Sequence, residues 1–256
     1  SITYEAPKLE AANFSKKESA GNKASGKQDG VADIKAPFIH LHVHSQYSVL
    51  QATADAGEII AQAKANGMDA VALTDLGNLY GAFSFVAEAQ KAKIKPIVGC
   101  EFFLSEERRK NKFTKDNPDR RYNQVLLAKD QEGYRNLSKL SSLGFTEGLY
   151  GNFPRIDKDL VSRHAKGLIA TTGGLNSEIP HLILNTGMRQ AEAAFRWWKE
   201  TFGADFYVEL NRHGLPEEDH VNTALLELCR KYDVRYFPAN EVYYLRKEDS
   251  NAHDVM

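Results

Sequence analysis

The hydrophobic and polar positions after Phe38 change their period several times, and these changes predict alternating strands and helices. Short apolar runs typical of buried strands alternate with segments whose apolar residues recur every three or four positions, which is typical of amphipathic helices. The predicted strands are residues 38–44, 69–75, 95–103, 124–130, 167–173, 205–211 and 235–241. The predicted helices include residues 56–67, 82–93, 188–203 and 216–232.

Seven strands, most of them followed by a helix, indicate an α/β fold in which helices cover a parallel sheet. Seven or eight such units favour a closed barrel, and fewer would favour an open sheet, so we expect a (β/α) barrel. Residues 1–37 differ from this pattern, because the stretch SKKESAGNKASGKQDG has no large apolar residue to bury. We therefore expect a flexible linker or tail at residues 1–37 and a folded domain at residues 38–256.

In such barrels, the chemistry gathers at the carboxyl ends of the strands. The residues at these ends are His42, His44, Asp75, Glu101, Asn123, Gln124, Gly173, Gly174, Asn211 and Glu241. His42 and His44 share one face of their strand, because side chains alternate faces. Glu101 would complete a site of two imidazoles and one carboxylate, with an open position for water. His-x-His alone is not specific, and histidines at the edge of the core are the alternative interpretation.

Composition narrows the class of protein. The chain of 256 residues has a formal net charge of −1 and a pI near 6.7, so no overall basic field marks it as a nucleic-acid binder. Its two cysteines, Cys100 and Cys229, make no disulfide framework, which favours a reducing, cytoplasmic setting. The sequence contains no apolar run of about 18 residues and no signal-peptide pattern, so we expect no contact with a membrane.

Several sequence words then point to a family. Eight sequence segments occur in the following order: FIHLHVHSQYSVL, GMDAVALTDLGNLYGAFSF, IKPIVGCEFF, LLAKDQEGYRNLSKLSSLGF, PRIDKDL, GLIATTGGLNSEIP, FYVELNRHG and EDSNAHDVM. Together they resemble the PHP (polymerase and histidinol phosphatase) domain of the bacterial replicative DNA polymerase III alpha subunit, from Phe38 to Met256. The resemblance implies a distorted seven-stranded (β/α) barrel. The chain ends inside the word HDVM, so we expect an excised piece whose carboxyl-terminal edge is truncated.

In family members with an intact site, strand-end ligands bind up to three metal ions that hydrolyse phosphoesters, and in some polymerases they proofread. By resemblance, His42 and His44 match the first motif, and Glu101 matches the acid of the GCE motif. The remaining ligand positions depart from the family pattern: Gln51 replaces Asp, Leu76 and Gln124 replace His, Gly174 replaces Cys, Glu241 replaces Asp and Tyr243 replaces His. Asp75 is either a group that orients a ligand or a plain strand-end carboxylate.

These departures predict loss of the catalytic cluster. Leucine and glycine offer no lone pair to a cation, and glutamine and tyrosine are poor ligands beside imidazole or carboxylate. The residual metal candidates are His42, His44, Glu101 and Glu241, enough for one ion at best, and we expect no catalytic residue in this chain. An empty site is the first expectation, and one Zn²⁺ or Mn²⁺ ion at a remnant site is the second. Mg²⁺ would serve only the parent polymerase.

The resemblance implies a role as a scaffold. The parent would extend DNA by nucleotidyl transfer. This piece would stabilise the rest of the alpha chain and dock the proofreading exonuclease, either as a separate subunit or fused upstream of residues 1–37. It would reach DNA through the parent.

Two other classes stay open. One is a metal-dependent phosphoesterase or a 3′–5′ proofreading PHP domain with a residual metal site. The other is a DNA-binding module that uses the segment RRKNKFTKDNPDRR at residues 108–121. That segment carries seven basic and two acidic residues, and its alternative interpretation is a solvated loop.

Overall fold

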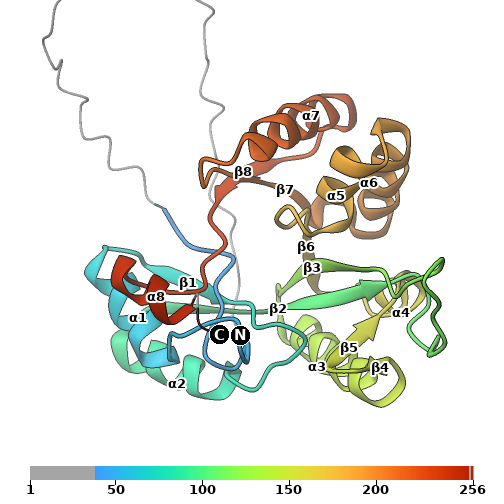
Figure 1. Ribbon diagram of the computed structural model, residues 1–256. Coiled ribbons are helices and arrows are strands. Elements are labelled where there is room, and N and C mark those ends of the chain that lie inside the picture. The colour runs from blue at the N-terminus through green and yellow to red at the C-terminus, as the bar shows by residue number, and fades with distance from the viewer. Residues whose placement is uncertain (1–37, 254, 256) are drawn as a thin grey trace, which may run out of the picture.

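The computed structural model describes residues 38–253 and 255 of the chain. The tail predicted at residues 1–37 lies outside these described residues. Within them, the chain forms one eight-stranded sheet with helices packed around it, which confirms the α/β class (Figure 1). The strands are β1 (Ala70–Leu73), β2 (Lys95–Ser105), β3 (Arg121–Ala128), β4 (Leu149–Tyr150), β5 (Phe153–Ile156), β6 (Leu168–Thr171), β7 (Phe206–Asn211) and β8 (Tyr236–Ala239). The α-helices are α1 (Ala56–Ala65), α2 (Ala82–Ala92), α3 (Gln131–Glu147), α4 (Lys158–Arg163), α5 (Glu178–Asn185), α6 (Met188–Phe202), α7 (Pro216–Tyr232) and α8 (Ser250–His253).

The sheet mixes parallel and antiparallel pairs, whereas the strand and helix pattern predicted parallel pairs only. Its order is β4-β5-β2-β3-β6-β7-β8, and β1 also pairs with β2. The β1–β2, β2–β5, β6–β7 and β7–β8 pairs are parallel. The β2–β3, β3–β6 and β4–β5 pairs are antiparallel. Residues 106–120, between β2 and β3, contain no helix, and without such a crossover β3 runs back antiparallel to β2.

Six of the seven predicted strands correspond to β1, β2, β3, β6, β7 and β8. The first one, predicted at residues 38–44, is not a regular strand and has one isolated bridge, between Val43 and Val242. On one side of this segment, the Ala72 amide donates to the His40 carbonyl at 2.9 Å; on the other, the His44 amide donates to the Val242 carbonyl at 2.9 Å. The segment therefore lies between β1 and the residues that follow β8. It joins the ends of the sheet at β1 and after β8 into a barrel-like arrangement without a regular ladder.

Local sequence signals place the helices as predicted. The Asp55 carboxylate caps α1 by accepting a hydrogen bond from the Glu58 amide at 2.8 Å. In α6, apolar residues recur at helical spacing, and Trp198 on the inner face is fully buried. One apolar core lies between α1, α2 and β1, and a larger one lies among α3 to α7. Figure 1 shows α1 and α2 together at one end and α5, α6 and α7 at the other. None of the described helices has the length and apolarity needed to cross a membrane.

Candidate metal centre

Three of the predicted metal ligands, His42, His44 and Glu101, form one group in the interior. Their ligand atoms all lie within 4.8 Å of one another, and each residue is at most 1% exposed. The two histidines come from the segment between β1 and Val242, and Glu101 comes from β2. Because alternate residues of such a segment share one face, both imidazoles are directed toward the same carboxylate.

The Glu101 carboxylate lies between the two imidazole rings. Its Oε2 is 2.7 Å from His44 Nε2, and its Oε1 is 3.4 Å from His42 Nε2. The other ring nitrogens also face acceptors. His44 Nδ1 lies 3.1 Å from the Val242 carbonyl oxygen, and His42 Nδ1 lies 3.2 Å from Glu209 Oε2. Because each Nδ1 faces an acceptor, we place a proton on it. Each Nε2 faces the Glu101 carboxylate, which favours a proton or a cation between the nitrogen and the carboxylate.

This arrangement of charges shifts two pKa values. Burial alone lowers the pKa of His42, but the carboxylates of Glu101 and Glu209 outweigh burial and raise that pKa well above its usual value. Burial alone raises the pKa of Glu101, but the neighbouring His42 and His44 hold it well below its usual value. Near neutral pH, His42 and Glu101 are therefore an imidazolium and a carboxylate.

Glu209, in β7, is a member of this site that the sequence analysis missed. It is 1% exposed, and its second carboxylate oxygen accepts a hydrogen bond from the Thr171 hydroxyl. Gln124, at one of the departing ligand positions, donates from Nε2 to the Thr171 carbonyl at 2.7 Å. The signal that was available is a single acidic residue inside the otherwise apolar start of the word FYVELN. A buried acid in such a strand indicates a specific partner.

Asp75, at the end of β1, fixes the loop that follows His44. Its carboxylate accepts hydrogen bonds from the Ser45 amide at 2.7 Å, the Ser45 hydroxyl at 2.8 Å and the Ser48 hydroxyl at 2.7 Å. Its backbone carbonyl accepts a bond from the Glu101 amide at 3.0 Å. Asp75 thus ties the histidine segment to β2, and this geometry favours an orienting role over that of a plain strand-end carboxylate.

Glu241, the fourth residual candidate, does not join the group of three. The Tyr243 hydroxyl donates to one Glu241 oxygen, and the Tyr243 ring stacks on the His44 ring with centroids 4.3 Å apart. A Cβ built at Gly174 would lie 2.4 Å from the other Glu241 oxygen. Glu241 therefore occupies the space that a larger residue at position 174 would need. Burial, together with Glu101 and Glu241, raises the pKa of Tyr243 and keeps its hydroxyl protonated as a donor.

The other departing positions add no ligand to the group. Gln51 is exposed in a turn. Leu76 pairs with Glu101 through the backbone, but its side chain has no lone pair. Gln124 is buried, and its amide nitrogen is bound to the Thr171 carbonyl. Among the described residues, the metal-ligand group therefore consists of His42, His44 and Glu101, and the loss of a catalytic cluster stays a prediction.

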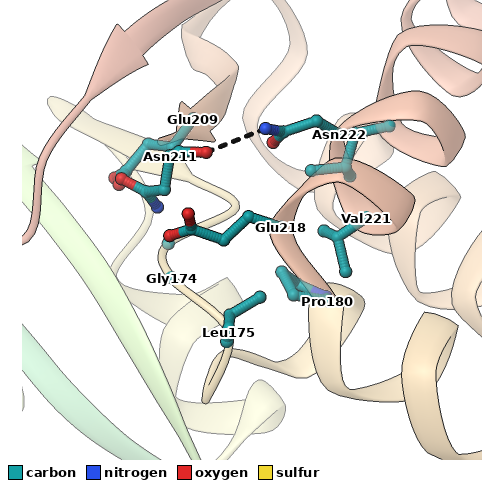
Figure 2. A pocket seen from close by; sticks show the side chains of 10 residues that line it. Gly174, Leu175, Pro180, Glu209, Asn211, Glu218, Val221 and Asn222 are labelled. Carbon is teal, nitrogen blue, oxygen red and sulfur yellow. Dashed lines mark hydrogen bonds between the residues drawn. The ribbon is translucent and has the colours of Figure 1, made fainter. Parts of the chain in front are cut away.

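A narrow pocket lies beside Glu209 (Figure 2). Figure 2 shows the Glu218 carboxylate pointing toward Gly174 and Asn211, and the Asn222 amide donating to the Asn211 carbonyl at 2.8 Å. The pocket volume of about 10 Å³ corresponds to roughly one water molecule. A phosphoester substrate therefore does not fit in this pocket.

Buried arginines hold the basic loop between β2 and β3. Arg108 is buried and pairs with Asp157 and with Glu147, each at 2.8 Å. Arg155, also buried, donates to the carbonyls of Arg108 at 2.9 Å and Lys110 at 2.7 Å. Some of the positive charge of the loop is therefore neutralised by ion pairs within the fold. The segment is a loop, and its use as a DNA-binding surface stays a prediction.

Solved structures share this fold. A protein from Bifidobacterium adolescentis, described as a metal-dependent phosphoesterase, gives a TM-score of 0.53 at 12% identity, covering 81% of this chain and 88% of that one. An amidohydrolase from Chromobacterium violaceum, solved with sulfate and no metal, gives a TM-score of 0.53 at 15% identity, covering 82% and 89%. At such identities the likeness shows the fold alone. The chain thus has the barrel-like α/β fold of these proteins.

Sequence comparison defines the family within this fold class. Residues 40–213 match the PHP domain family, and the chain belongs to that family. DNA polymerase III subunit alpha of Borreliella burgdorferi is 43% identical over 226 residues, which are 87% of this chain and 19% of that protein. The same subunit of Thermus aquaticus is 40% identical over 225 residues, which are 87% and 18% of the two chains. The chain thus spans about a fifth of the length of these relatives.

Proposed function

We propose that this chain is the PHP-domain part of a DNA polymerase III alpha subunit, whose complete polypeptide copies DNA by nucleotidyl transfer. The 43% identity to the Borreliella burgdorferi alpha subunit over 226 residues carries the proposal. Because the chain spans about a fifth of such relatives, polymerisation and its Mg²⁺ ions belong to other parts of the parent. This part reaches DNA through the parent.

Within the parent, the PHP domain acts as a scaffold. A cluster of several ions needs about three protein ligands for each ion. The group in the described residues gathers His42, His44 and Glu101, and Leu76 and Gly174 bring no donor to it. The domain at residues 38–256 instead holds the rest of the alpha chain and the proofreading 3′–5′ exonuclease. The exonuclease is bound either as a separate subunit or through a fusion upstream of residues 1–37.

The scaffold proposal is tested by mixing the purified chain with the exonuclease subunit of the same source and separating the mixture by size-exclusion chromatography. We expect the two proteins to elute together as a complex of one copy of each. Separate elution, with the PHP chain still folded by circular dichroism, would argue against docking of the exonuclease in trans.

The sequence analysis puts an empty site first, but the buried group of His42, His44 and Glu101 supports its second expectation, a single Zn²⁺ or Mn²⁺ ion. Imidazole nitrogen and carboxylate oxygen are ligands that both ions accept. His42 Nε2 is buried and lies 3.4 Å from Glu101 Oε1, and no other group in the described structure forms a hydrogen bond with it. A bound ion would supply positive charge that neutralises Glu101 and would link the histidine segment to β2. We propose that this role is structural.

The metal content of the chain tests the single-ion site. After dialysis against Zn²⁺ and Mn²⁺ and removal of free ions, mass spectrometry should find one ion per wild-type chain and none in His44→Ala. Two or three ions per chain would show that other residues complete a cluster, and would favour a phosphoesterase.

The second candidate function is a residual phosphoesterase, and the buried group of His42, His44 and Glu101 is the observation that favours it. The wild-type chain and His42→Ala are compared for hydrolysis of a phosphodiester with Zn²⁺ or Mn²⁺ added. Under the scaffold proposal, both show the same background rate. Hydrolysis by the wild type alone would assign the chain to the hydrolases.

A further inference from the structure

We infer that Glu209 is a positioning residue, whose carboxylate fixes the imidazole of His42 so that Nε2 is presented to a metal ion held with His44 and Glu101. The inference rests on the single-ion site proposed above. Glu209 is not a member of the ligand group, because its carboxylate meets Nδ1 of His42, the ring nitrogen that does not face Glu101.

The two histidines are held in the same way by different acceptors. His42 Nδ1 lies 3.2 Å from Glu209 Oε2, and His44 Nδ1 lies 3.1 Å from the Val242 carbonyl oxygen. An acceptor beside Nδ1 keeps a proton on that nitrogen and leaves Nε2 as the metal ligand. Both Nε2 atoms accordingly face Glu101. A carboxylate acceptor also makes the imidazole a stronger ligand, which a peptide carbonyl does less.

Glu209 is itself held in place on both sides. One carboxylate oxygen accepts a hydrogen bond from the Thr171 hydroxyl, and the Glu209 amide donates to Thr172 Oγ1 at 2.9 Å. Its side chain is 0% exposed, and His42 is the charged group that pairs with it. A carboxyl group buried in this way is unfavourable unless its oxygens have hydrogen-bond partners. Packing alone therefore gives no reason for a glutamate here, whereas orientation of His42 does.

Glu218 offers a matched control. It is also a buried carboxylate, at 3% exposure, and it also meets the Nδ1 of a histidine, His213, at 2.6 Å. It lines the same narrow pocket as Glu209 (Figure 2). In the described structure, its carboxylate bonds to His213 and Leu215 and not to the three metal ligands. A substitution there tests the loss of a buried carboxylate without the loss of the contact to His42.

The experiment compares Zn²⁺ affinity in the wild-type chain, Glu209→Gln, Thr171→Val and Glu218→Gln, by competition with a chromophoric chelator. We expect Glu209→Gln to bind Zn²⁺ about 10- to 100-fold more weakly. Thr171→Val, which frees one oxygen of Glu209, should weaken binding in the same direction. Glu218→Gln should stay within about twofold of the wild type.

A spectroscopic measurement separates positioning from general loosening of the fold. In ¹⁵N-edited NMR spectra, the Nδ1 proton of His42 should be shifted downfield and protected from exchange in the wild type and in Glu218→Gln. In Glu209→Gln, the same proton should move upfield and exchange faster, while circular dichroism stays unchanged. Equal affinities of Glu209→Gln and wild type would overturn the inference and leave the single-ion site standing. Failure of the wild type to bind Zn²⁺ would overturn both.

Discussion

At the scale of single residues, Leu50 carries backbone strain that no packing offsets. It follows the histidine segment with a φ of 60°, in the left-handed region, and its side chain is 64% exposed. A residue with a Cβ pays about 1–2 kcal/mol there, whereas glycine adopts the region freely but loses about 0.5–1 kcal/mol through its more flexible unfolded state. We expect Leu50→Gly to raise the free energy of unfolding by about 0.5 kcal/mol in urea denaturation.

The neighbouring Val49 is the control for this prediction. It is 72% exposed, and its φ is not positive. Val49→Gly therefore relieves no strain and should lower the free energy of unfolding by about 0.5–1 kcal/mol. If the two glycine variants changed stability in the same direction and by the same amount, the strain at Leu50 would not be the cause.

The buried pair of His42 and Glu101 makes the stability of the metal-free chain depend on pH. The folded pKa of His42 lies above its unfolded value of about 6.5. The contribution of His42 to the free energy of unfolding is complete below that pH, and it is lost as the pH rises through the folded-state pKa. The folded pKa of Glu101 lies below its unfolded value of about 4.3, so its contribution is complete above that pH and is lost on acidification.

Both contributions are therefore complete between about pH 4.3 and pH 6.5. With EDTA present, we expect the urea midpoint to fall from pH 6 to pH 9. The fall should shrink in His42→Gln and persist in His213→Gln, whose histidine lies outside the site. An equal fall in His42→Gln and in the wild type would show that other groups control the alkaline loss.

The sequence predicts which residues of the site lie at strand ends, but it does not predict their side-chain contacts. The grouping of His42, His44 and Glu101 was expected, because residues at strand ends on one face converge, while their role as metal ligands stays a prediction. Glu209 was missed, because its role comes from a contact with a residue 167 positions away. Glu241 was placed at the right strand end, but the direction of its long side chain depends on Tyr243 and on the space above Gly174. Strand spacing carries no information on such neighbours.

At the scale of elements, one of the two buried arginines that hold the loop between β2 and β3 binds the backbone of the loop directly. Arg155, in β5, is 1% exposed and pairs with Asp119 at 2.8 Å while binding the carbonyls of Arg108 and Lys110. Its Nε also donates to the Gly148 carbonyl at 2.9 Å. Without the guanidinium, these three carbonyls lose a donor, and Asp119 keeps only its ion pair with Arg121. We expect Arg155→Met to lower the free energy of unfolding by about 3 kcal/mol. Amide hydrogen exchange should quicken at residues 106–120.

The exposed pair of Arg163 and Asp159 is the control for Arg155. Their side chains are 54% and 70% exposed and lie 2.5 Å apart on α4. Arg163→Met should change the free energy of unfolding by about 0.5 kcal/mol or less. If Arg155→Met had an effect as small as this, or if exchange at the loop were unchanged, the loop would not depend on Arg155.

The helices and strands were predicted correctly where a local sequence pattern determines them. They were missed where strand pairing determines them. The apolar spacing at residues 56–67 predicted α1, and the alternation of strands and helices gave the class. The direction of β3 was missed, because apolar runs look alike in parallel and antiparallel strands. The strands β4 and β5 were missed because one has two residues and the other contains Pro154, which sequence patterns assign to turns.

At the scale of the whole molecule, the ends of the sheet meet at the histidine segment. This segment bonds to β1 on one side and to Val242 on the other, and its His42 and His44 face Glu101 of β2. The proposed metal site and the closure of the sheet therefore share the same few residues. Leu76 and Gly174 contribute no side-chain ligand to this link, which is consistent with the proposal that the domain serves as a scaffold.

A bound ion should accordingly stabilise the molecule as a whole. An ion that binds the folded chain alone adds RT ln(1 + [L]/Kd), about 2.7 kcal/mol at a free concentration 100 times Kd. Because His42, His44 and Glu101 link the ends of the sheet, we expect Zn²⁺ to shift the entire unfolding transition to higher temperature in calorimetry. EDTA should reverse the shift, and His44→Ala should show none. A shift that persisted in His44→Ala would place the stabilising ion elsewhere, and a shift of only part of the transition would mean that the segment does not hold the sheet together.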